Sequence, residues 1–100
     1  MFYNIHHDQA TNTLNVSFGE ATTVDNILKE ANELACNLKS DVMGEVLRIN
    51  GAMPVAVAFR LSAIFGNVVP AIAVFIPQEK KYVIASSTNP SYKIGDWLEN

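Results

Sequence analysis

Apolar residues follow two different spacings along the chain, and the change between them marks the expected elements. Apolar and polar residues alternate in Phe2–His7 and in Thr13–Phe18, which predicts two strands with one buried face, joined by a polar turn. From Thr22 to Lys39 the apolar residues recur at the spacing of one helical face. This pattern predicts a helix that covers a sheet, and Thr22 or Thr23 is suited to cap its start.

The stretch from Leu47 to Ile76 predicts a strand, a tight loop, a buried helix and a second strand. Pro54 suits the first helical position and Gly66 the residue just past the last turn. Asn50 and Gly51 have the chemistry of a turn, because both tolerate a positive φ. The helix is apolar almost all round, so we expect its own sheet and another subunit to cover it.

Two further strands complete the pattern. The apolar run 70–77 is typical of a central strand that is covered on both faces, and residues 82–85 follow a polar turn as its hairpin partner. Residues 92–98 form a short closing segment. The sequence therefore predicts an α/β protein with one compact domain over residues 1–100 and the order β-β-α-β-α-β-β. Its mixed sheet is covered by two helices, in a ferredoxin-like or sensor-domain-like arrangement, and the third and fourth strands are parallel.

Composition narrows the classes of function. A chain of 100 residues with 49 % hydrophobic and 17 % charged residues can bury a core. The formal charge of −3 argues against binding to duplex DNA, which needs a basic face. Cys36 is the only cysteine, so there is neither a disulfide framework nor a thiolate metal site. The longest apolar run is too short for a membrane span and the first residues are unlike a signal peptide, so we expect a cytoplasmic protein.

The common catalytic motifs are missing. The chain has no His-x-x-x-His pair, no G-x-S-x-G elbow, no Walker-type glycine loop and no C-x-x-C motif. His6 and His7 are strand neighbours that point to opposite faces, so they are not expected to converge on a metal ion. Most carboxylates fall on the first helix and in turns, where a solvated face explains them. The N–H groups at the start of the second helix form a generic anion site.

Several short motifs occur in order along the second half of the chain. They are Ile49-Asn50-Gly51, Pro54-Val55-Ala56, the apolar strand 71–75 that leads to Pro77, Lys81-Tyr82-Val83-Ile84 followed by Ser86, and Asn89-Pro90-Ser91-Tyr92-x-x-Gly95-Asp96. With these motifs the chain resembles the small CRISPR-associated ring nucleases of type III systems, first described as manganese-dependent exoribonucleases. The resemblance implies a dimeric α/β protein of antiviral defence, which binds cyclic tetra-adenylate between dimers and cleaves it.

The chain departs from the family at the positions that carry the chemistry. Where the family has an Asp-Pro-Arg or Asp-Pro-Lys turn after the central strand, this chain has Ile76-Pro77-Gln78. The family's Ser-His at the next strand end is Ser86-Ser87, and no histidine lies between Arg60 and Asn67. The groups expected to bind metal or to move a proton are therefore replaced.

Three hypotheses remain open. The leading one is a CRISPR-associated accessory protein that binds a cyclic oligoadenylate or short RNA, or pairs with an active relative, while its own chemistry is lost or relocated. The second is an active metal-dependent ring nuclease or exoribonuclease, with manganese as its cofactor and with residues that the motifs do not locate. The third is a small oligomeric interaction module without a nucleotide. All three include a homodimer or a higher homo-oligomer, because the second helix and the central strand present much apolar surface.

The predicted order of the strands also indicates where a ligand is expected. Ligands of open α/β sheets gather at the carboxyl ends of strands, so we expect the loop 50–52 to meet the polar exit 86–88. This requires the third and fifth strands to run the same way. Arg60 is either a surface side chain or an anion contact at a subunit boundary. The candidate ligand-binding residues are Arg48, Asn50, Gly51, Ala52, Arg60, Ser86 and Ser87, and no metal ligand is assigned.

Overall fold

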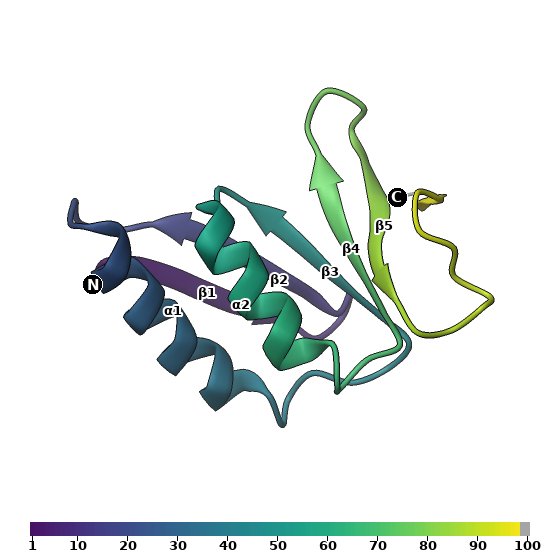
Figure 1. The fold of residues 1–100 in the computed structure, drawn as a ribbon, viewed down its shortest axis with the longest axis horizontal. Helices are drawn as coiled ribbons and strands as arrows, with labels where there is room; N and C mark the ends of the chain where they lie inside the picture. Colours follow the sequence, from purple (N-terminus) through teal and green to yellow (C-terminus); the bar gives the residue numbers. More distant parts are fainter. Residues whose placement is uncertain (99–100) are drawn as a thin grey trace.

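The computed structural model describes residues 1–98, which form one six-stranded sheet and two helices (Figure 1). The elements are β1 (Tyr3–Asp8), β2 (Thr13–Phe18), α1 (Val24–Leu38), β3 (Val46–Gly51), α2 (Val55–Phe65), β4 (Ala71–Ile76), β5 (Lys81–Ser87) and β6 (Trp97–Leu98). The strands lie in the sheet in sequence order, with β2, β3 and β4 parallel and the other neighbours antiparallel. The predicted α/β domain with a mixed sheet is confirmed, and β6 lies in the predicted closing segment.

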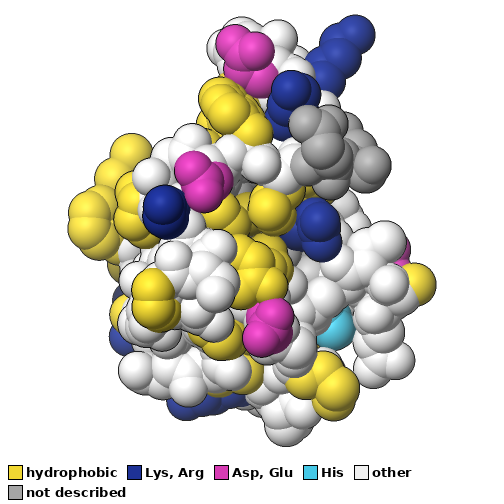
Figure 2. All heavy atoms as spheres, turned by 90° about the vertical axis from the view of Figure 1, so that its right-hand side faces the viewer, with side chains coloured by type: hydrophobic (Ala, Val, Ile, Leu, Met, Phe, Trp, Pro, Cys, Tyr) yellow, Lys and Arg dark blue, Asp and Glu magenta, His cyan; other side chains and the backbone are white. Residues whose placement is uncertain are grey.

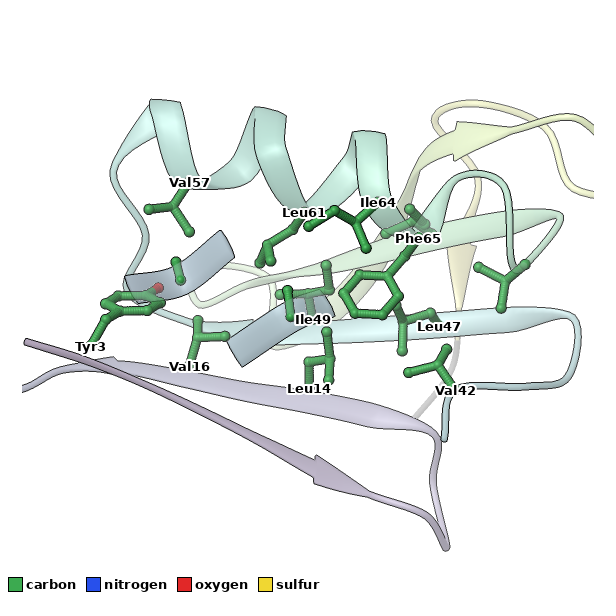
Figure 3. Packing of buried hydrophobic residues seen from close by; sticks show 14 of the residues in the cluster. Tyr3, Leu14, Val16, Val42, Leu47, Ile49, Val57, Leu61, Ile64 and Phe65 are labelled. Carbon is green, nitrogen blue, oxygen red and sulfur yellow. The ribbon is translucent and has the colours of Figure 1, made fainter. Parts of the chain in front are cut away.

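Both helices lie on the same face of the sheet, and the β4–β5 hairpin extends past them (Figure 1). Alternate strand residues point toward the helices and form the main core, as the hydrophobic spacing predicts. Its largest fully buried side chains include Tyr3, Leu14, Leu47, Val57, Leu61 and Phe65 (Figure 3). Neither α1 nor α2 lies on the other face of the sheet, and we call that face the open face.

A second, smaller core lies on the open face over β4 and β5. It contains Ala71, Ala73, Tyr82 and Ile84, and Tyr92 and Leu98 of the C-terminal segment pack against it. Within residues 1–98, this segment packs over β4 and β5 and leaves the half of the open face formed by β1, β2 and β3 largely uncovered. The predicted covering of both faces of β4 is confirmed for residues 71–73, whereas residues 74–76 are only partly buried.

The ends of the helices largely follow the sequence prediction. Thr23 is the N-cap of α1, but its side chain makes no capping hydrogen bond to a backbone N–H group of the helix. Pro54 has an extended ψ of 151° and is the N-cap of α2, one position before the predicted one. Gly66 follows the last helical residue as predicted, and a Cβ there would lie 2.6 Å from the carbonyl oxygen of Ser62. Space, and not a positive φ, therefore favours glycine at this C-cap.

The prediction of a turn at Asn50 and Gly51 is wrong, because β3 continues through both residues. Gly51 has a φ of +131°, and a Cβ on it would lie 1.9 Å from the carbonyl oxygen of Val16 on β2. Glycine suits a turn, and it equally suits a strand position at which the backbone approaches a neighbouring strand closely. The sequence alone therefore does not distinguish the two cases. Gly51 thus serves the pairing of β2 with β3.

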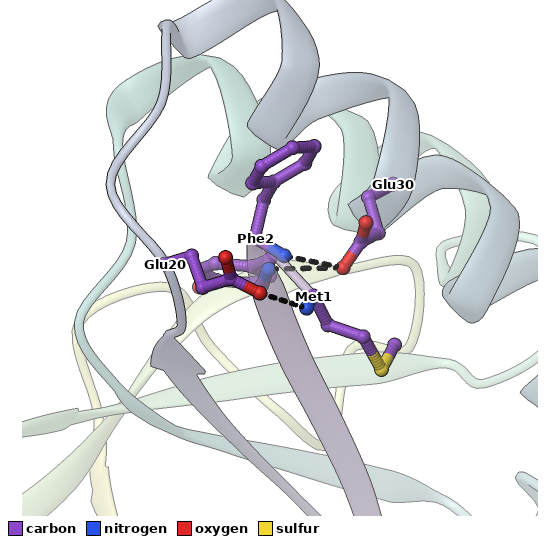
Figure 4. A network of polar contacts seen from close by, with 5 residues as sticks. Met1, Phe2, Glu20 and Glu30 are labelled. Carbon is purple, nitrogen blue, oxygen red and sulfur yellow. Dashed lines mark hydrogen bonds and ion pairs between the residues drawn. The ribbon is translucent and has the colours of Figure 1, made fainter.

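Two carboxylates of the first half of the chain hold its N-terminus (Figure 4). Glu30 of α1 accepts hydrogen bonds from the backbone N–H groups of Phe2 and Tyr3, at 2.8 and 3.1 Å. The N-terminal ammonium group of Met1 lies 2.9 Å from Glu20, whose carboxylate raises the pKa of this amine. Glu30 is therefore more than part of a solvated face, because it fixes the edge strand β1 to α1.

Candidate functional site

Polar side chains form two rows across the uncovered half of the open face. The strand register places Asp8, Thr13 and Arg48 side by side in one row, and His6, Asn15 and Asn50 in the next. Side chains directly opposite each other on paired strands are about 5 Å apart at Cβ. A hollow of about 500 Å³ lies over the first row, and its lining includes Thr13, Asn15, Arg48 and Tyr82. We call these four residues together with Asn50 the open-face site.

Arg48 is the centre of this site. Its guanidinium carbon lies 5.6 Å from the centre of the Tyr82 ring, in a cation–π contact. No carboxylate among residues 1–98 forms an ion pair with it. Asp8, in the same row, instead accepts hydrogen bonds from the N–H of Ala10 and the hydroxyl of Thr11, at 3.0 and 3.2 Å. Among residues 1–98, nothing therefore occupies the guanidinium donors, and they are available to an anion.

Amides and aromatic rings flank this cation. Asn15 and Asn50 are paired in the register, and neither side-chain amide is hydrogen-bonded to another residue in the part of the chain that the structure describes. Tyr82 also contacts Phe75 edge-to-face, with ring centres 5.1 Å apart. The site thus combines a fixed positive charge, two free amides and an aromatic support, a combination that suits a planar ligand with a negative group.

The turn between β1 and β2 forms one wall of a second hollow of about 630 Å³, at the amino ends of β2 and β3. Asn12 holds this turn at a φ of +52°. Its amide nitrogen donates to the carbonyl oxygens of Met43 and Val46, and its amide oxygen lies 2.8 Å from Nε2 of His7. Nδ1 of His7 is buried without a hydrogen-bond partner. Asn12 therefore ties the turn to the start of β3, next to the open-face site.

The hydrogen bonds of two tyrosines have consequences for their ionisation. The hydroxyl of Tyr3 donates to the carbonyl oxygen of Ala52 at 2.6 Å, and burial raises the pKa of Tyr3 to about 12. The hydroxyl of Tyr92 donates to a carboxylate oxygen of Glu45 at 2.7 Å, and this contact raises the pKa of Tyr92. Glu45 is thereby engaged with the C-terminal segment rather than with Arg48.

The structure separates the residues that were predicted to bind a ligand. Arg48 and Asn50 share the open face. Arg60 extends from α2 on the helix side, where its Nε donates to the amide oxygen of Asn32 at 2.6 Å. Ser86 lines an apolar groove beside α2. The hydroxyl of Ser87 donates to the carbonyl oxygen of Asn89 at 2.9 Å.

The expected meeting of the loop 50–52 with the exit 86–88 is wrong for a single subunit. β3 is parallel to β4, whereas β5 is antiparallel to β4. Ala71 at the start of β4 pairs with both Val46 and Ser87, so Ser87 lies near the start of β3. Gly51 is at the other end of that strand, where it pairs with Val16. The hollows on the open face lie at the amino ends of β2 and β3, not at their carboxyl ends.

The sequence reasoning missed three members of the open-face site: Thr13, Asn15 and Tyr82. The signal for Asn15 was present, because it alternates with Leu14 and Val16, which predicts that it faces away from the core. The local pattern does not contain the register of β2 with β3. This register pairs Asn15 with Asn50, which lies 35 positions further along the chain.

Other features of the chain add little to the site. No group of three or more His, Cys, Asp or Glu residues within the described range 1–98 is placed to hold a metal ion. None of the helices in this range has the length and apolar character needed to cross a membrane.

Comparison with known proteins finds no match to the chain among protein-family models, curated proteins or solved structures.

Proposed function

We propose that this protein binds a short adenine ribonucleotide on its open-face site and does not hydrolyse it. The observation that supports this most is Arg48, a partly buried guanidinium that forms no ion pair with a carboxylate of residues 1–98 and that an aromatic ring supports. The resemblance in the sequence indicates a cyclic oligoadenylate as the ligand class. The proposal therefore includes a role in type III antiviral signalling, in the cytoplasm, for a homodimeric relative of the ring nucleases.

The chemistry of the site fits such a ligand. An arginine guanidinium binds phosphate oxygens through two parallel N–H donors. A side-chain amide of asparagine can pair with the edge of adenine through one donor and one acceptor, and two such amides lie side by side at Asn15 and Asn50. A net charge of −3 disfavours long polyanions but permits a single well-placed phosphate contact.

Two observations argue against hydrolysis by this chain. Cleavage of a phosphodiester needs a metal or acid–base assistance, and isoleucine at position 76 supplies neither. Furthermore, Ile76 pairs with Lys81 at one end of the β4–β5 hairpin, whereas Ser87 pairs with Ala71 at the other. Five residues of strand separate these ends, or roughly 17 Å. The positions that match the family's catalytic motifs therefore do not meet in one subunit.

A binding assay with paired arginine variants tests the proposal. Calorimetric titration with cyclic tetra-adenylate, linear tetra-adenylate and a uridine tetranucleotide measures the affinity and the base preference. Arg48→Gln removes charge-assisted hydrogen bonds and should weaken binding about tenfold to a hundredfold. Arg60→Gln removes the same charge from the helix side and should change the affinity less than about twofold.

The outcomes separate the three hypotheses. No binding of any of these ligands, or equal loss in both arginine variants, would refute the open-face site. Incubation with cyclic tetra-adenylate and manganese, followed by chromatography, should leave the ligand intact. Turnover that persists through repurification and is abolished by a point change in this chain would instead establish the manganese-dependent nuclease.

A further inference from the structure

The hollow at the amino ends of β2 and β3 brings acidic side chains close to Arg48. This hollow of about 630 Å³ is lined by Asp41, Glu45 and Arg48, among others. On the side of the molecule that carries the C-terminal segment, acidic and basic side chains are interspersed and neither sign forms a large patch (Figure 2). Which carboxylate meets which cation therefore depends on individual contacts, and Glu45 has a specific one.

Glu45 is close enough to Arg48 in the chain to compete for its guanidinium. Glu45 directly precedes β3, and Arg48 is the third residue of that strand. Three residues of strand span roughly 10 Å, a distance that the long side chains of glutamate and arginine cover when they extend toward each other. The two side chains nevertheless form no ion pair. One carboxylate oxygen of Glu45 instead accepts a hydrogen bond from the hydroxyl of Tyr92 at 2.7 Å.

The C-terminal segment fixes Tyr92 on both sides. Before it in the chain, the carbonyl oxygen of Asn89 accepts a hydrogen bond from the N–H of Tyr92 at 2.9 Å. After it, the N–H of Gly95 donates to the carbonyl oxygen of Ile84 on β5, also at 2.9 Å. The ring of Tyr92 packs against the smaller core on the open face. The hydroxyl is therefore presented to its acceptor by a ring in a defined position.

We propose that Tyr92 is a positioning residue, which holds the carboxylate of Glu45 away from Arg48 and so leaves the guanidinium free for an anionic ligand. This inference rests on the proposed function, because it concerns how the open-face site is kept ready. A hydroxyl–carboxylate hydrogen bond is charge-assisted, so it competes well with a solvent-exposed ion pair. The same bond raises the pKa of Tyr92, as expected for a phenol that donates to a carboxylate. Without this hydroxyl, Glu45 pairs with Arg48 and a ligand must displace it.

A double-mutant cycle on Tyr92 and Glu45 tests the proposal, with cyclic tetra-adenylate as the titrant. Tyr92→Phe keeps the packed ring but removes the hydroxyl, and it should weaken binding about threefold to tenfold. In the Glu45→Gln background, which has no carboxylate at this position, Tyr92→Phe should change the affinity less than about twofold. Asp41 lines the same hollow without a hydrogen bond to Tyr92, so in the Asp41→Asn background Tyr92→Phe should still weaken binding about threefold to tenfold.

A measurement without ligand separates this proposal from the proposed function. The NMR signal of the Arg48 Nε–H group, assigned by its loss in Arg48→Gln, should shift in Tyr92→Phe, and this shift should vanish in the Glu45→Gln background. Circular dichroism verifies that each variant folds. If the native chain binds no ligand but the signal behaves as expected, the proposed function is wrong and the positioning of Glu45 by Tyr92 stands.

Two results would overturn the proposal. One is an Arg48 signal that Tyr92→Phe leaves unchanged. The other is a loss of affinity in Tyr92→Phe that is equally large in the Glu45→Gln background, or that Asp41→Asn abolishes as fully as Glu45→Gln does. In that case the hydroxyl of Tyr92 acts through the general structure or charge of the hollow and not through Glu45.

Discussion

The substitution Gly51→Ala tests how β3 approaches β2. A residue other than glycine at a φ of +131° costs about 1 to 3 kcal/mol in backbone strain. The added Cβ would also lie 1.9 Å from the carbonyl oxygen of Val16, well inside the 3.4 Å at which ordinary contact begins. Relief requires the two strands to separate at this end, which loses one or two ladder hydrogen bonds of about 1 kcal/mol each. We expect a total loss of about 2 to 5 kcal/mol in the free energy of unfolding.

A second glycine of the chain provides the control. Gly95 also has a positive φ, of +94°, but a Cβ on it would meet no atom within 4 Å. Gly95→Ala therefore reports the strain alone, and we expect a loss of about 1 to 2 kcal/mol. Urea unfolding followed by circular dichroism measures both variants. If the two substitutions cost the same within about 0.5 kcal/mol, the close approach of Gly51 to Val16 does not contribute to stability and the reasoning is refuted.

Two further predictions concern the polar contacts near the site. Asn12→Ala removes the hydrogen bonds to Met43, Val46 and His7, and it should lower the free energy of unfolding by about 2 to 4 kcal/mol, measured in urea; a loss below about 0.5 kcal/mol would contradict the role of this side chain. The raised pKa of Tyr3 adds stability that is complete below pH 10 and is lost as the pH rises through about 12. The difference in the free energy of unfolding between pH 8 and pH 12 should therefore be about 2 kcal/mol larger in the native chain than in Tyr3→Phe, and equal pH dependence would contradict this prediction.

The hydrophobic spacing was sufficient to predict the elements, because burial of alternate residues is a local property. Leu14 and Val16 identify the inner face of β2 without any knowledge of its neighbours. The same local information is ambiguous at Asn50 and Gly51, where a turn and a close strand approach demand the same residue types. Only the distance from Gly51 to Val16, on a strand far away in sequence, distinguishes the two cases.

The location of the site depends on the pairing of strands that are far apart in the sequence. It was therefore predicted less well than the helices and strands themselves. The hairpin between β4 and β5 requires that β5 run against β3, so the ends of those two strands cannot meet in one subunit. Arg48 and Asn50 were predicted as ligand-binding residues, but the register that gathers Thr13 and Asn15 beside them is absent from any local pattern. A parallel register between strands joined through a helix is a product of packing, and it becomes visible only in the folded sheet.

The state of Arg48 in the free protein explains why an anion can bind there at low cost. If Asp8 were paired with the guanidinium, a phosphate would first have to displace the Asp8 carboxylate. The net free energy of phosphate binding would then be small. Asp8 is instead held by the N–H of Ala10 and the hydroxyl of Thr11 within its own turn. The ring of Tyr82 supports the guanidinium through a contact worth about 0.5 to 2 kcal/mol, which leaves its N–H donors open. A phosphate therefore adds charge-assisted hydrogen bonds of about 1.5 to 3 kcal/mol to a cation that is already in place.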